Sequence, residues 1–398
     1  MLNRPITAPL AACLALLSLC NPARSESEGS SLEFKNEVFW DRNEVWNVTP
    51  AFVLRKMISR KWTLSWEQEV DVVSGASRRI GSDRVGPFGD RELDGVSGAS
   101  KIEVRHSENP VLTYSHQGLV ASGSFYYSRE EDYVSRSPAV SLSMDFNDRN
   151  TTLGGSYSEF FDEFQPLGAF ADQGGSKRIR TLGATLAQSL TSLTLVGFTA
   201  THVNSWGYLG HPYNPPVDAS GTMLTEEVPD RKRAGAVSGQ IVQGFHLGER
   251  LGSLNLDGRR YQDTWGLKST TLDMKYSQYF QDGTYFRLRG RYYQQTRASF
   301  AKDVYTGKEA YRTADVRWYP FSSYLIGAKL SGPFPEEWGQ SAFLPDRWDL
   351  KYDHMLRDTR GDPESPAAGE PRWTRYQLYG PDEQYHQGVF MVGLLFEL

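Results

Sequence analysis

Charged residues recur at every second position in two separate stretches of the chain. One stretch carries carboxylates and the other guanidiniums: Glu67, Glu69 and Asp71, and Arg287, Arg289 and Arg291. Because alternate side chains of a β-strand point to the same face, each ladder would project from one face of a strand. Opposed ladders lining one water-filled space would set a transverse field that selects charged solutes. The alternative is that both ladders pair with neighbouring charges and only fill a closed interior.

A second cluster contains arginine, tyrosine, aspartate and tryptophan within a few residues. Its members lie where two predicted strands are joined: Arg259, Arg260, Asp263 and Trp265. Such side chains can hold a loop folded through charge-assisted hydrogen bonds. Alternatively, the two arginines contact anionic lipopolysaccharide. Both interpretations are structural rather than catalytic.

The acidic run Glu130–Asp132 could bind a divalent cation, since carboxylate oxygens are ligands for such ions. A solvated acidic loop is the alternative. Motifs with a defined chemistry are absent from the sequence: HExxH, CxxC, CxxCH and GxSxG. We therefore expect no catalytic residues, no resident metal and no cofactor, and the chain is not predicted to be an enzyme.

Apolar and polar residues alternate around these charges. From Trp62 to Val72 the even positions are apolar except Gln68, and the odd positions are polar or acidic. Similar alternation recurs in the ranges 140–146, 272–280, 286–291 and 348–353. A period of two is typical of strands with one apolar and one polar face.

The connections between these runs differ in length. Tight turns are predicted at Asp282-Gly283, Asn147–Asn150, Thr191-Ser192, Gln117-Gly118 and Pro320–Ser323. Longer irregular stretches lie near 73–99, 129–137, 162–178, 204–230, 299–310 and 333–345. Alternating short and long connections are typical of a transmembrane antiparallel β-barrel with short periplasmic turns and long outer loops. A soluble β-sandwich has no reason to sort its loops in this way.

The pattern predicts an all-β fold of about 16 strands, with a range of about 14 to 18. The count depends on Ser31–Trp40 and Arg372–Gly380, whose alternation is weaker. The long stretch Asp358–Pro371 falls where a periplasmic turn is expected. It is either an exception or an outer loop, in which case the count is off by one strand.

The chain ends in a strand with one apolar face, formed by Phe390, Val392, Leu394, Phe396 and Leu398. Barrel-assembly machinery recognises such terminal strands, which usually end in an aromatic residue rather than leucine. Backbone groups cannot stay unpaired in hydrocarbon, so a sheet in lipid must close on itself. A soluble exported sandwich or propeller predicts the same alternation but not this terminal strand.

Residues 1–25 have the features of a secretory signal peptide, with Arg4, the apolar run Ala8–Leu19 and a small-residue cleavage site at Ala23–Ser25. The alternative is a lipoprotein signal at Leu10–Cys13. Both cysteines of the chain, Cys13 and Cys20, belong to this segment. Residues 26–398 are predicted to form one barrel domain in the outer membrane of a Gram-negative cell.

Composition excludes several classes. Only 39% of the 398 residues are hydrophobic, without the apolar runs of about 20 residues that a helical membrane protein needs. Aromatic residues make up 13%, too many for a disordered chain. The net charge of −5 gives no basic excess for binding nucleic acid.

Several strings together resemble the DUF3570 family of Gram-negative outer-membrane β-barrel proteins. They run in the same order over nearly the whole chain: Asp71–Ser77, Ser128–Ser135, Arg260–Gly266, Arg291–Gln295 and Ala298–Phe300. Departures are Arg129 within the second string and Lys302-Asp303 after the last. Members often accompany flavin-attaching and redox-like exported proteins, so the resemblance implies a role in envelope redox or transport. It brings no catalytic residues.

We expect a porin-like channel for small solutes, or a scaffold for envelope redox partners. Outer-membrane lipid, lipopolysaccharide, the barrel-assembly machinery and periplasmic flavinylated or redox proteins are the expected partners. The alternatives are a barrel-wall enzyme acting on lipid and a purely structural or docking protein. The enzyme would need serine and histidine on adjacent lipid-facing strands.

Overall fold

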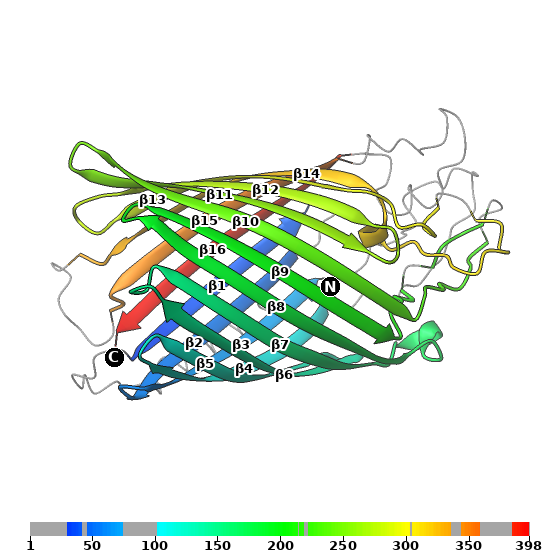
Figure 1. Cartoon of the computed structure of the whole chain (residues 1–398). Helices are drawn as coiled ribbons and strands as arrows, with labels where there is room; N and C mark the ends of the chain where they lie inside the picture. The colour runs from blue at the N-terminus through cyan, green and yellow to red at the C-terminus, as the bar shows by residue number, and fades with distance from the viewer. Residues whose placement is uncertain are drawn as a thin grey trace.

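Sixteen antiparallel strands of the computed structural model close into one barrel (Figure 1). The structure describes residues 30–41, 46–74, 102–213, 215–218, 222–302, 305–335, 344–358 and 384–397. The predicted signal peptide, Leu398 and Arg372–Gly380 lie outside the described residues. The barrel and its 16 strands confirm the predicted fold class.

The strands follow one another around the wall in chain order. Their bounds are β1 Ser31–Asp41, β2 Trp46–Ser59, β3 Trp62–Ser74, β4 Ile102–His116, β5 Leu119–Arg129, β6 Tyr133–Phe146, β7 Thr151–Phe164, β8 Gly175–Thr191, β9 Thr194–Gly207, β10 Arg231–Leu247, β11 Arg250–Asp263, β12 Lys268–Tyr279, β13 Tyr285–Gln295, β14 Phe321–Pro333, β15 Arg347–Asp358 and β16 Gln384–Glu397. Two 3-10 turns, η2 Gly168–Phe170 and η3 Val316–Trp318, lie in connections. Neither described helix is long and apolar enough to span a membrane.

The first and last strands close the barrel. β1 pairs with β16 from Ser31 opposite Glu397 to Asp41 opposite Gln387. Ser31–Trp40 is therefore a strand, as expected. Because the barrel is closed, every strand has a hydrogen-bonded neighbour on both sides. The sheet therefore has no edge strand with unpaired backbone N–H and C=O groups, which are unfavourable in lipid and promote aggregation in water.

The two ends of the barrel differ in their connections. The short-turn end carries four of the predicted tight turns, at Gln117-Gly118, Asn147–Asn150, Thr191-Ser192 and Asp282-Gly283, and the start of β1. The long-loop end carries the 208–230 and 296–320 connections, which gather at one end in Figure 1. Sorting of loops by length thus follows the prediction, with four local differences.

The first two differences concern one predicted long loop and one predicted tight turn. Residues 129–137 are not a long loop, because only 130–132 separate β5 from β6. Pro320–Ser323 is not a turn between strands, since β14 begins at Phe321.

The other two differences concern the last connections. β14 ends at Pro333 and β15 begins at Arg347 at the short-turn end, although a long connection separates them, and β15 ends at Asp358 at the other end. Of the predicted exception Asp358–Pro371, all but Asp358 lies outside the described residues, and the strand count is 16 without any correction. Proline and glycine mark a long connection but do not reveal at which end it lies.

Alternate residues face the outside and the lumen. Outward-facing side chains are large and apolar, and Ile326, Val140 and Phe198 are 74%, 59% and 59% exposed. On β16 the outward face includes Phe390, Val392, Leu394 and Phe396, as predicted, and Phe390 pairs across to Val38 of β1. The opposite faces carry the buried polar side chains and most ion pairs, so the interior is polar.

Candidate functional site

The basic ladder lies on the lumen face of β13. Arg289 donates two hydrogen bonds to Asp273 Oδ2 of β12, at 3.1 and 2.8 Å, and Arg291 Nε donates to the same oxygen at 2.6 Å. Arg287 donates instead to the Ser277 hydroxyl at 3.1 Å. Among the described residues no ion pair involves Arg287, so its charge is the least compensated of the three.

A glycine makes room for an ion pair that crosses a strand. Gly327 of β14 is registered between Arg289 of β13 and Asp353 of β15. Arg289 Nη1 lies 3.7 Å from Asp353 Oδ2, and Lys351 Nζ lies 3.0 Å from the same oxygen. A Cβ at Gly327 would come within 1.9 Å of Asp353 Oδ1, so only glycine leaves this pair undisturbed.

The acidic ladder lies on the lumen face of β3. Arg105 of β4 pairs with Asp71 and, at 3.1 Å, with Glu69. The Thr49 hydroxyl donates to Asp71 Oδ1 at 2.5 Å. Glu67 is exposed, and the described residues contain no ion pair to it. Each ladder thus has compensated members and one side chain, Glu67 or Arg287, that presents its charge to the lumen.

The two ladders face one enclosed space from well-separated parts of the wall. By the shorter way round, five strands (β2, β1, β16, β15 and β14) separate β3 from β13. The structure therefore combines both sequence-based interpretations, because neighbouring charges pair while the net signs of the two sectors differ. Charges of opposite net sign on two separated parts of the wall create an electric field across the interior of the barrel.

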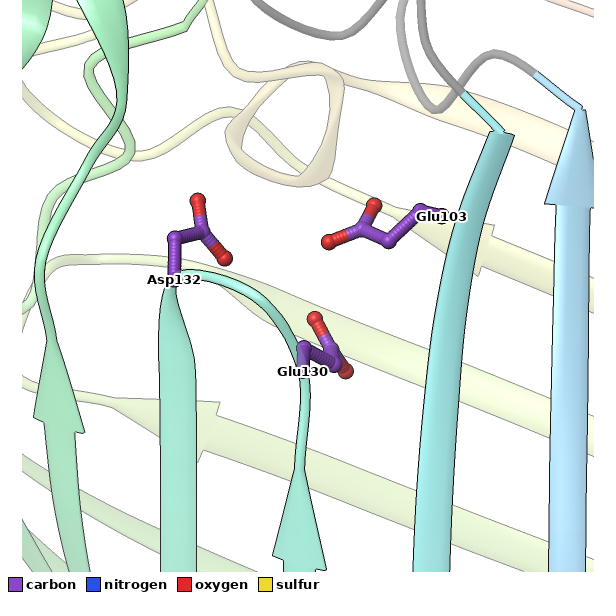
Figure 2. Close-up of side chains that lie close together, drawn as sticks. All are labelled: Glu103, Glu130 and Asp132. Carbon is purple, nitrogen blue, oxygen red and sulfur yellow. The ribbon is translucent and has the colours of Figure 1, made fainter.

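Three carboxylates converge at the long-loop end (Figure 2). Glu103 of β4 faces Glu130 and Asp132 of the β5–β6 connection, and one oxygen from each lies within 4.8 Å of the others. Burial, followed by the negative charge of Glu103, raises the pKa of Glu130 to about 7. Oxygen ligands of this kind suit a hard divalent cation. Glu131, which belongs to the predicted acidic run, is exposed and is not part of this group, whereas Glu103 from a neighbouring strand is.

A lysine side chain of the lumen wall lies next to this cluster of carboxylates. Lys177 Nζ of β8 lies 3.7 Å from Asp162 Oδ2 of β7 and 5.0 Å from the centre of the Tyr133 ring. Tyr133 and Ser135 both donate hydrogen bonds to Asp162, at 2.5 and 2.6 Å. The carboxylate is held by three groups, so the ammonium beside it is fixed in position.

The two longest described connections fold onto one another over this end. Glu227 and Arg312 exchange backbone hydrogen bonds of 2.9 and 2.7 Å. Glu226 accepts hydrogen bonds from the Thr313 hydroxyl, at 2.5 Å, and from the His211 amide. Burial raises the pKa of Glu226 to about 7. We call this contact, formed by residues 208–230 and 296–320, the loop cap.

The loop cap also contacts the wall on the β5–β8 side. The Tyr213 hydroxyl donates to Asp132 and accepts a hydrogen bond of 3.0 Å from the Leu167 amide. The His211 ring stacks on Phe164 at 6.5 Å between centroids. Burial, and then the positive charge of Arg317 in the other loop, lowers the pKa of His211. The cap is therefore tied to the β5–β8 part of the wall as well as to the strands that its own loops connect.

The Arg-Tyr-Asp-Trp cluster forms the base of the loop cap. Asp263 Oδ1 accepts hydrogen bonds from the amides of Trp265 and Leu267, at 3.0 and 3.1 Å, and closes the turn into β12. Trp265 is 3% exposed and packs against Ala298 and Phe300, so two of the strings that carried the family resemblance meet in space. The aspartate and tryptophan hold the loop, as expected.

The two arginines of that cluster do not act together. Consecutive strand residues face opposite sides, so Arg259 faces the lumen and Arg260 faces outward. Arg260 Nη1 donates to the hydroxyl of Thr270 on the outer wall.

Sequence reasoning missed several groups of this site. Asp273 and Asp353 had only weak signals, since a single acid in an alternating strand has many interpretations. Lys232 of β10, which lies 4.5 Å from the centre of the Trp318 ring, and Glu226 were missed because loop folding decides their neighbours. The alternation at Asp273 and Lys275 could have flagged the first of these.

Comparison with protein families identifies the family of this chain. A family described as "Protein of unknown function (DUF3570)" matches residues 8–344. The chain belongs to the DUF3570 family. This confirms the resemblance drawn from the sequence, and the match includes the loop-cap strings around Trp265 and Phe300. A comparison with curated proteins found no match for this DUF3570 chain.

Solved structures with a similar arrangement are distant in sequence. One described as a bacterial polysaccharide outer membrane secretin has 7% identity and a TM-score of 0.49, with 92% of this chain and 98% of that chain covered. Pseudomonas aeruginosa OccK2 (OpdF), in complex with glucuronate, has 11% identity and a TM-score of 0.39, with 93% and 98% covered. The outer membrane protein OpdK of the same organism has 9% identity and a TM-score of 0.39, with 92% and 98% covered.

Proposed function

We propose that this DUF3570 chain is an outer-membrane channel for small, polar or charged solutes, acting by passive passage without bond chemistry. The observation that carries the proposal is the pair of oppositely charged ladders, on β3 and β13, facing one lumen. A closed barrel of 16 strands is wide enough to leave an aqueous passage. Solutes would be oriented by the field between the two sectors.

Membrane placement is supported by the outer wall. Apolar side chains with large exposed fractions surround the barrel, and a soluble protein rarely leaves so many in contact with water. Aromatic pairs lie toward both ends: the Trp62 ring contacts that of Tyr114 near the short-turn end, and the Tyr292 ring contacts that of Tyr324 near the long-loop end. Such pairs correspond to the aromatic girdles of outer-membrane barrels.

This placement puts the short turns in the periplasm and the loop cap outside the cell, as in other barrels of this type. The terminal strand β16, with its apolar outer face, supports assembly by the barrel machinery. The loop cap narrows the outer entrance, and solutes would pass beside the acidic cluster and Lys177.

Planar-bilayer recordings test the channel, using refolded full-length protein. Glu67→Gln and Arg287→Gln remove one charge from opposite sectors and break no described ion pair. One unit charge about 10 Å from the pore axis changes the energy of a monovalent ion by about 0.4 kcal/mol, a factor of about two in permeability ratio. Glu67→Gln should favour anions and Arg287→Gln cations, most clearly at low salt.

The recordings have two outcomes that would refute the proposal. Absence of current from a barrel that still shows heat-modifiable gel mobility would indicate a sealed structure. Shifts of equal sign in the two variants would show that the ladders do not set the field. Gln188→Glu, a change on the wall near a hairpin, serves as a control for nonspecific effects of charge.

A further inference from the structure

A shallow groove runs across the outer wall over four strands, β8 to β11. Its volume is about 510 Å³. One bank carries outward-facing Leu182, His202 and Gln262, and the other carries Ala200, Val237 and Arg260. The residues between the banks point into the lumen, so their backbone forms the floor. Small residues keep the groove open, since a Cβ at Gly235 would meet nothing closer than 3.9 Å.

Cations gather on the same outer face between this groove and the long-loop end. Arg231 and Arg233 of β10 are exposed and lie at the start of their strand. Arg180 of β8 is registered in the same row as Arg233, with one residue of β9 between them. Arg180 pairs with Glu159 at 3.3 Å, whereas no ion pair of Arg231 or Arg233 occurs among the described residues.

The groove and the arginines thus lie in the same order as the acyl chain and the charged headgroup of a lipid. The groove spans about 14 Å across four strands, enough for much of an acyl chain. The arginines lie toward the end where the outer membrane surface is placed by the proposed function, on which this inference rests. Guanidinium groups bind phosphate through paired hydrogen bonds.

We propose that this surface is a binding site for a phosphorylated glycolipid of the outer leaflet, the lipid A part of lipopolysaccharide. One acyl chain lies in the groove. A phosphate contacts Arg231 and Arg233, and Arg260 with Gln262 contacts the polar region where the chain begins. The site faces away from the lumen and is separate from the solute pathway.

Binding can be measured with folded full-length protein in mixed micelles, titrated with fluorescent hexa-acylated lipid A. The triple variant Arg231→Gln, Arg233→Gln, Arg260→Gln should weaken binding at least about tenfold. Gly235→Leu fills the groove without changing charge and should also weaken it. The matched control Arg129→Gln, Arg136→Gln removes outward-facing arginines from β5 and β6 and should bind as the parent does.

Three results would overturn the site: equal affinity of the triple variant and the parent, equal weakening in the control, or binding of phosphatidylglycerol as tight as that of lipid A. Dephosphorylated lipid A should lose most of its affinity for the parent but little for the triple variant. Bilayer conductance of the triple variant should match the parent. If neither the parent nor the triple variant conducts ions but the parent still binds lipid A, the channel proposal is refuted and the lipid site is retained.

Discussion

Replacing Gly327 by alanine tests how the lumen charges are held. The new Cβ would lie 1.9 Å from Asp353 Oδ1 and 3.3 Å from the Tyr352 carbonyl oxygen. The backbone cannot yield without disturbing the β14–β15 ladder, so Asp353 must rotate. Rotation separates its carboxylate from Arg289 and Lys351, which lie 3.7 and 3.0 Å away.

The loss can be bounded from burial. The side chain of Asp353 is 9% exposed, while those of Arg289 and Lys351 are 19% and 26% exposed. Exposed pairs contribute about 0.2–1 kcal/mol, and breaking a buried pair costs about 3–5 kcal/mol. The rotated carboxylate can reach lumen water, so we expect about 1–2 kcal/mol of destabilisation.

Gly290→Ala is the matched control. Its Cβ would meet nothing within 4 Å, so this variant should be neutral or stabilised by about 0.4–1 kcal/mol. Urea unfolding in lipid vesicles, followed by tryptophan fluorescence, measures both. In an Asp353→Ala background the cost of Gly327→Ala should vanish. Equal midpoints for Gly327→Ala and Gly290→Ala, or a cost that persists in that background, would refute this account of the ion pair.

Three further predictions concern the lumen and the loop cap. Asp273→Asn leaves Arg289 with a single carboxylate partner, so the free energy of unfolding should fall by about 2–3 kcal/mol. The loss of a negative charge should also shift bilayer selectivity toward anions, and an unchanged reversal potential would contradict this. The raised pKa of Glu226, about 7 against an ordinary 4.5, means that the folded cap binds the proton more tightly than the open one. The contribution of Glu226 to cap stability is therefore fully present below pH 4.5 and is lost as the pH rises through 7. Faster hydrogen exchange of residues 208–230 would measure this loss, and Glu226→Gln should remove the pH dependence. Asp263→Ala removes the acceptor of two turn amides and should raise Trp265 accessibility to quenchers, whereas an unchanged quenching constant would show that packing alone holds the turn.

The architecture of the barrel can be predicted from local patterns in the amino-acid sequence. Period-two alternation around Trp62–Val72, the hairpin at Asp282-Gly283 and the apolar face of β16 were sufficient to predict a closed barrel of about 16 strands. These signals are local, because the two faces of one strand meet different media and a two-residue turn needs specific residues. The ladders at Glu67 and Arg287 could be placed on strand faces for the same reason.

Contacts between residues that are distant in sequence became known from the folded barrel alone. The register of β13, β14 and β15 places Asp353 beside Arg289 across Gly327, although the two residues are 64 positions apart and their strands are not adjacent. Packing of two loops buries Glu226, and strand register places Arg260 on the outer face of the wall and Arg259 on the lumen face. Long-range pairing depends on which strands become neighbours and on how loops fold over the mouth, and neither is encoded in the local alternation of side chains.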